Sequence, residues 1–193
     1  MMKKRHFLAA LSGSGVALST QAKVGNAASP TLLTVTGAIG KANRGPIDIA
    51  LDQMMAKQKI GFDKACTFDF GTLTALPSVS IKPTLEYDNK ARMLKGPLLS
   101  DVLMAAGANP ADGTSLTMRA VDGYSPTITM GDVRKYRFIV ATHLDGKPMP
   151  LGGLGPLWAI YDADRFPEMA ARKITERFAL CPWALYHIDV AKG

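Results

Sequence analysis

The segment from Trp158 to Arg165 concentrates the side chains that binding of a flat heterocycle requires. Trp158 and Tyr161 offer aromatic faces for stacking, and Asp162 can accept hydrogen bonds from ring N–H and amino groups. Arg165 can donate to a carbonyl. The glycines within 152–155 either let a ligand approach the backbone closely or form a plain surface loop. We therefore predict a ligand site here.

The alternative for Trp158 is a core position, which is the more common one for an isolated tryptophan. In a regular strand Trp158 and Tyr161 face opposite sides, so both line one wall only where the strand twists or ends. Two further candidates for ligand binding lie outside the segment 158–165. Tyr124 follows the Asp122–Gly123 turn, and His143 lies inside an apolar run, where a hydrogen-bonded core imidazole is the common interpretation.

Cys66 and Cys181 could form one disulfide in an oxidising compartment. They could also be two buried thiols, or Cys181, followed by Pro and Trp183, could be a reactive thiol beside a pocket. No metal site is expected, because the histidines at 6, 143 and 187 show no paired ligand spacing around either cysteine.

Common catalytic signatures are absent from the sequence. It has no G-x-S-x-G turn, no GxxxxGK[ST] phosphate loop, no HExxH and no CxxC. The glycines of 152–155 are not followed by a helical pattern, so they do not predict a dinucleotide-binding turn. We therefore assign no catalytic residue.

The composition is that of a globular protein, and the distribution of charge does not favour nucleic-acid binding. The 193 residues suffice for one domain, and 47% of them are hydrophobic. The net charge is +7, but residues 1–28 carry four basic residues and no acidic one, which leaves +3 for the rest. The remaining Lys and Arg are interspersed with Asp and Glu, as on an ordinary solvated surface.

Residues 1–28 have the order of a secretory signal peptide. A basic start is followed by a short apolar stretch over 7–18 and then by small residues at 25–29. A buried helix is the alternative, but Gly13 and Gly15 make it a poor one. We expect cleavage near Ala27 or Ala28, export to the periplasm, and a soluble domain spanning 29–193.

The pattern of elements predicts an α+β fold. Alternating apolar residues predict strands at 32–39, 78–87, 115–121, 127–130, 137–144, 157–161 and 184–190. Helical spacing predicts helices at 49–60 and 98–106, with a short helical turn at 72–76. A hairpin turn is expected at 145–146. Strands and helices do not alternate regularly, so the pattern favours α+β over a doubly wound parallel sheet.

Several motifs in a fixed order carry a family resemblance. The order is KGPLLSDVL from Lys95, then AVDGYSPTI, then FIVATHLDGKPMPLGGLGPLWAIYDADRFPE, then RFALCPW before the last strand. Over about 32–190 the chain resembles the sulfite-oxidase-like (oxidoreductase molybdopterin-binding domain) family, in particular its small periplasmic members without the molybdenum-ligating cysteine. The resemblance implies twisted sheets around a pterin-sized cleft.

In the enzymes of that family, one cysteine and a pterin dithiolene hold molybdenum, and an Arg- and Gly-rich region binds the cofactor phosphate. Neither Cys66 nor Cys181 matches that position, so no tightly bound cofactor is expected, and a molybdenum cofactor is the alternative. The resemblance instead implies a pterin ligand, held by Trp158, Tyr161, Asp162 and Arg165, with Tyr124, His143 and Arg44 as weaker candidates. It also implies a partner, the periplasmic domain of a membrane-bound diguanylate cyclase or phosphodiesterase in cyclic-di-GMP signalling.

Overall fold

The computed structural model describes residues 29–192, and the predicted signal peptide at 1–28 lies outside the described residues. In chain order the elements are β1 (Leu33–Gly37), α1 (Gln53–Lys57), β2 (Cys66–Phe68), α2 (Phe70–Ala75), β3 (Ser78–Ile81), β4 (Leu94–Pro97), α3 (Leu99–Ala105), β5 (Ser115–Ala120), β6 (Thr127–Thr129), α4 (Met130–Lys135), β7 (Ile139–Ala141), β8 (His143–Leu144), β9 (Lys147–Pro148), β10 (Trp158–Ile160), the 3-10 turn η1 (Ala163–Arg165), α5 (Pro167–Ala170), α6 (Ile174–Arg177) and β11 (Leu185–Val190). The α+β class predicted from the sequence is confirmed.

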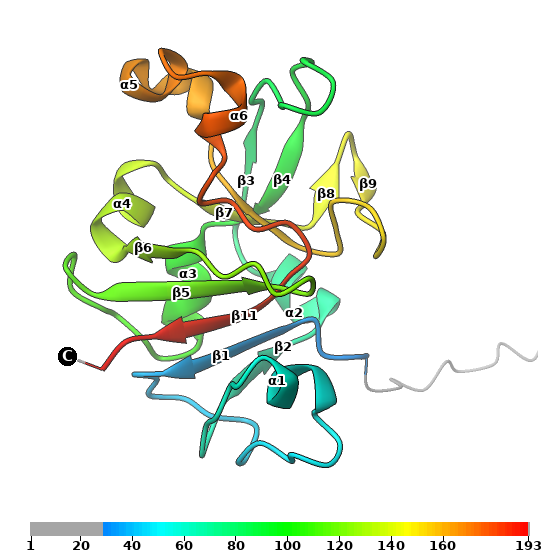
Figure 1. Cartoon of the computed structure of the whole chain (residues 1–193), viewed down its shortest axis with the longest axis vertical. Helices are drawn as coiled ribbons and strands as arrows, with labels where there is room; N and C mark the ends of the chain where they lie inside the picture. Colours follow the sequence, from blue (N-terminus) through cyan, green and yellow to red (C-terminus); the bar gives the residue numbers. More distant parts are fainter. Residues whose placement is uncertain (1–28, 193) are drawn as a thin grey trace, which may run out of the picture.

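The largest sheet has the strand order β2-β1-β11-β5-β6. Its central strand β11 is parallel to β1 and antiparallel to β5, so the last strand of the chain joins the first one to the middle of the chain. Figure 1 shows this sheet in the lower half of the molecule, with α1 below it and α5 and α6 at the opposite end.

The other half contains the pair β7-β10 and the four-stranded sheet β3-β4-β8-β9. Gly96 on β4 lets this strand approach β7, because a side-chain carbon at Gly96 would lie 1.9 Å from the carbonyl oxygen of Val140. One hydrophobic core connects the two halves, and Met55, Ile60 and Tyr186 form a second, smaller cluster under α1.

A directed chain of hydrogen bonds crosses the polar face of the large sheet. The Arg119 guanidinium can only donate, so Nδ1 of His187 accepts from it at 3.1 Å. Nε2–H of His187 then donates to Thr36 Oγ1 at 3.0 Å, and the Thr36 hydroxyl donates to Asp189 at 2.7 Å. His187 is fully buried, and its burial together with the charge of Arg119 lowers its pKa to about 4.

The helix predicted at 49–60 is shorter than expected. Only α1 is helical, because Oδ1 of Asp48 accepts from the backbone N–H groups of Ala50 and Leu51 and forms a local turn there. Ile49 and Leu51 are 71% and 80% exposed, so their helix-like spacing does not reflect burial.

The long strand predicted at 137–144 divides into two. Its first part, β7, pairs with β10, whereas β8 pairs with β4 and β9. The strand predicted at 78–87 ends at Ile81, as the bend expected at Pro83 allows. The turn at Asp145 and Gly146 is confirmed, and both residues have positive φ. Within residues 29–192, no helix is long and apolar enough to cross a membrane.

Candidate functional site

Trp158 and Tyr161 do not present a stacking face in this structure. The Trp158 ring is 1% exposed, and its Nε1 donates to the carbonyl oxygen of Cys181 at 3.0 Å. Tyr161 is also buried; its ring stacks on Phe138 at 4.9 Å, and its hydroxyl donates to the carbonyl oxygen of Arg177 at 2.6 Å. Trp158 therefore occupies a core position, as the alternative interpretation of the sequence held, and Tyr161 is a core residue as well.

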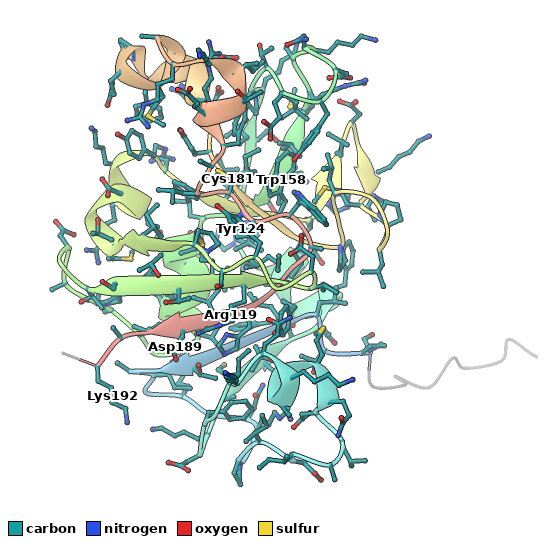
Figure 2. All side chains as sticks on the ribbon, in the orientation of Figure 1. Arg119, Tyr124, Trp158, Cys181, Asp189 and Lys192 are labelled. Atoms are coloured by element: carbon teal, nitrogen blue, oxygen red, sulfur yellow. The ribbon has the colours of Figure 1, made fainter. Side chains whose placement is uncertain are left out.

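Tyr124 is half exposed, and its hydroxyl donates to the carbonyl oxygen of Ala179. Three of the predicted binding residues thus hold the backbone of one segment, residues 177–181. Figure 2 shows Trp158 and Cys181 side by side with Tyr124 just beneath them. These side chains anchor the segment that leads into Trp183 and β11.

The other predicted residues lie apart from one another. Asp162 and Arg165, in the segment that follows β10, line a separate small cavity. His143 is half-buried on β8, where its ring lies 5.5 Å from that of Phe70. Arg44 forms an ion pair with Asp52, so its guanidinium already has a carboxylate partner. The structure does not gather the seven predicted residues around one ligand.

A groove forms instead where four loop segments meet, and we call it the Tyr87–Trp183 groove. Its volume is about 670 Å³, within the range of small-molecule sites. The lining residues are Tyr87, Val121, Asp122, Leu151, Gly152, Gly153, Leu154, Trp183 and Ala184. Tyr87 is 55% exposed and Trp183 is 36% exposed, so each ring has a free face.

Backbone hydrogen bonds fix the groove. The N–H of Val121 donates to the carbonyl of Ala184 at 3.1 Å, and the N–H of Ala184 donates to the carbonyl of Leu154 at 3.2 Å. The glycine-rich loop therefore lies against the segment that carries Trp183. Gly152 has φ +93, a conformation that favours glycine, and a side-chain carbon there would meet no atom within 4 Å. Gly152 and Gly153 thus leave the backbone open to the groove.

Trp158 lies one layer below this groove. Its ring centroid is 6.3 Å from that of Tyr87, and its backbone forms a bridge with Trp183. The predicted tryptophan consequently supports both exposed rings without facing the groove itself.

A smaller pocket of about 160 Å³ continues from the groove and shares Tyr87 and Trp183 with it. Glu86, Tyr124 and Cys181 also line this pocket. Burial and the neighbouring charge of Glu86 raise the pKa of Tyr87 to about 12, so its phenol is neutral at physiological pH. Burial also raises the pKa of the Cys181 thiol, which disfavours the thiolate.

The lining of the groove and the adjoining pocket suits an uncharged planar ring. It combines aromatic and glycine surfaces with the carboxylates of Asp122 and Glu86, and it includes no Lys or Arg. A molybdenum cofactor needs a thiolate for the metal and donors for its phosphate. The residues present do not fit that group, and within residues 29–192 no cluster of three His, Cys, Asp or Glu side chains could hold a metal ion.

Both cysteines are free and buried, so the disulfide considered for Cys66 and Cys181 is not formed. Cys66 lies on β2, and Cys181 lies in the segment held by Trp158.

Sequence reasoning missed Tyr87 and Leu151 and gave Trp183 only as the neighbour of Cys181. Tyr87 is the last residue of the strand expected at 78–87, and the residues around it, EYDNK, include no Gly or Pro that would mark a loop. The glycine loop was recognised, and the structure places Gly152 and Gly153 at the groove.

No family model matches the chain, and no curated protein matches it. Among solved structures, the fold is similar to that of the sulfane dehydrogenase SoxCD from Paracoccus pantotrophus, with a TM-score of 0.53 and 14% sequence identity over 83% of this chain. This chain spans 38% of the length of that one. The similarity concerns the fold alone.

Proposed function

We propose that this protein binds a pterin in the Tyr87–Trp183 groove and acts as a binding protein without redox chemistry of its own. The observation that carries the proposal is the pair of half-exposed aromatic rings, Tyr87 and Trp183, beside a glycine-rich backbone. A flat heterocycle stacks on such rings, and stacking of this kind contributes about 1–3 kcal/mol per base in nucleic-acid binding.

The polar lining indicates how the edge of the ring is recognised. A pterin carries an amino group and ring N–H groups, and carboxylate acceptors are supplied by Asp122 in the groove and by Glu86 in the adjoining pocket. Because no cation lines either cavity, the ligand we propose is a pterin without a phosphate group.

The remaining parts of the proposal rest on the family resemblance. The motif order resembles small periplasmic pterin-binding proteins, and the similar solved structure is, by its name, a dehydrogenase and hence an oxidoreductase, like the enzymes of the resembled family. We propose a periplasmic location and a partner, the periplasmic domain of a membrane-bound cyclic-di-GMP signalling enzyme, on this resemblance.

A molybdopterin-dependent oxidoreductase is the second candidate. The fold similarity to a dehydrogenase favours it, as does the position of Cys181 in the pocket beside the groove. The buried thiol, with its raised pKa, and the acidic lining argue against it. Elemental analysis of protein purified from its native compartment separates the two, because the oxidoreductase requires stoichiometric molybdenum.

Fluorescence titration with tetrahydrobiopterin and neopterin tests the groove directly. Tyr87→Ala and Trp183→Ala each remove one exposed ring, and we expect each to weaken binding roughly tenfold, equivalent to about 1.4 kcal/mol. Leu51→Ala is the matched control, since Leu51 is an exposed apolar residue outside the groove. Its affinity should equal that of the wild type.

Circular dichroism on every variant shows whether the fold is retained. If the wild-type protein binds neither pterin, the proposed function is wrong. If the wild type binds a pterin and both ring variants bind it with wild-type affinity, the pterin binds elsewhere and the groove is not its site.

A further inference from the structure

A second cavity, which we call the basic cavity, is lined in part by the segment that follows β10 and shares no lining residue with the groove or its adjoining pocket. Its volume is about 210 Å³. Sites for drug-sized ligands usually measure about 300–1,000 Å³, so this cavity suits a smaller molecule. It is lined by Val79, Ile81, Lys135, Tyr136, Arg137, Asp162, Arg165 and Phe166.

Asp162 is the unusual group in this cavity. Its side chain is 9% exposed, and Oδ2 accepts one long hydrogen bond from the backbone N–H of Lys82 at 3.3 Å. Its other oxygen, Oδ1, is buried and has no hydrogen-bond partner among the described residues. Asp162 is thus a nearly buried carboxylate with a single long hydrogen bond, and a ligand in the cavity that supplies a donor to it would be stabilised.

Two guanidinium groups of the basic cavity also lack a carboxylate partner in the described part of the chain. Arg137 and Arg165 take part in none of the ion pairs there, whereas Lys135 pairs with Glu168 at 2.8 Å. Arg137 also has a φ of 54, in the left-handed region that a residue with a side chain rarely adopts. Arg137 directly follows Tyr136, the C-cap residue of α4, and this is the position where helices commonly end in the left-handed conformation.

The uncompensated charges of the basic cavity form a defined pattern. Arg137 and Arg165 are both exposed, and each guanidinium can bind an anionic group bidentately, while the nearly buried carboxylate can accept from one cationic or N–H donor group. The rings of Tyr136 and Phe166 meet edge to face with centroids 5.0 Å apart and supply an apolar wall.

We infer that the basic cavity binds a free acidic amino acid. Its two carboxylates pair with Arg137 and Arg165, its ammonium group donates to the Asp162 carboxylate, and its short carbon chain lies against Tyr136 and Phe166. The charges of the ligand, two negative and one positive, mirror those that the cavity leaves unpaired. This binding is independent of the pterin site, because the two sites share no lining residue.

Isothermal titration calorimetry of the whole protein tests the inference with four probes. L-Glutamate and L-aspartate carry all three charged groups, glutarate lacks the ammonium group, and γ-aminobutyrate lacks one carboxylate. We expect saturable binding of at least one of the two amino acids, and roughly tenfold weaker binding of the other two probes, the equivalent of about 1.4 kcal/mol.

Asp162→Asn and Arg165→Gln locate the ligand. Each should weaken amino-acid binding by roughly tenfold or more, since each removes one charged partner. Arg165 is exposed, so its variant should fold even if a change at Asp162 disturbs the packing. Asp112→Asn, a carboxylate in an exposed ion pair outside the cavity, is the control and should bind as the wild type does.

The inference is overturned if neither amino acid binds at millimolar concentration, or if binding is unchanged in Arg165→Gln. Equal affinity for glutarate and L-glutamate would also overturn it, because the ammonium group would then have no role. Pterin titration of the same variants should give wild-type affinity, so failure here is distinguishable from failure of the proposed function.

Discussion

The indole N–H of Trp158 donates to the carbonyl oxygen of Cys181 at 3.0 Å, between residues 23 positions apart in the sequence. This bond attaches the segment before β11 to β10 and sets the position of Trp183, two residues further on. Trp158 is thus a positioning residue for the groove. The rings on which the proposed pterin would stack are those of Tyr87 and Trp183.

Trp158→Ala should destabilise the fold strongly. Removing a fully buried aromatic side chain costs about 3–5 kcal/mol, and the carbonyl of Cys181 also loses its donor. Urea unfolding followed by circular dichroism measures the loss. Trp183→Ala is the matched comparison; its ring is part of the surface, so we expect a loss of about 1 kcal/mol or less. Equal destabilisation by the two changes would contradict the anchoring role.

Both thiols should be present and protected. Burial is the largest cause that raises the pKa of Cys66, and it is also the largest for Cys181. A thiol reagent such as dithionitrobenzoate should react slowly with the folded protein and rapidly with both cysteines in guanidinium, because only the thiolate attacks. If no thiol is detected after unfolding without reductant, the cysteines form the disulfide that the structure does not contain.

The sequence predicts the α+β class and most strand positions, because alternation and turn residues are local signals. It fails where tertiary contacts decide. The start of the helix expected at 49–60 is replaced by a turn bonded to Asp48, so that only Gln53–Lys57 is helical. The strand at 137–144 divides because its two parts pair with different neighbours. For the site, the glycine loop was found, but the burial of Trp158 and the approach of Tyr87 depend on loops far apart in the sequence.

Two glycines of the groove loop should differ sharply in tolerance to substitution. A side-chain carbon at Gly155 would lie 2.4 Å from Cβ of Met149 and 2.6 Å from its carbonyl oxygen, whereas at Gly153 the nearest atom is 3.8 Å away. Gly155→Ala should therefore destabilise the protein by about 1–3 kcal/mol through overpacking. Gly153→Ala should stay within about 0.5 kcal/mol of the wild type in thermal unfolding. Similar losses for both would show that the loop packs differently.

His187 should make the fold sensitive to acid. Its pKa of about 4 in the folded chain lies below the ordinary value of 6.5, so the unfolded chain binds the proton more readily. The stabilisation is complete above pH 6.5 and is lost as the pH falls from there to about 4. The total loss is on the order of 3 kcal/mol, since each unit of pKa difference corresponds to about 1.4 kcal/mol.

Urea titrations between neutral pH and pH 4 measure this loss, and His187→Gln should flatten the pH dependence. His143→Gln removes the other histidine of residues 29–192 and should keep the wild-type loss, because His187 is unchanged. An identical pH profile in His187→Gln would exclude the buried imidazole as its cause.

The central place of β11 has a consequence for how the chain is made. Thr36 and His187, which meet side by side in the large sheet, are 151 residues apart, and only β11 connects the β2-β1 half to the β5-β6 half. The ribosome must therefore deliver residues 185–190 before this sheet can close. Until then β1 and β5 lack the strand that lies between them.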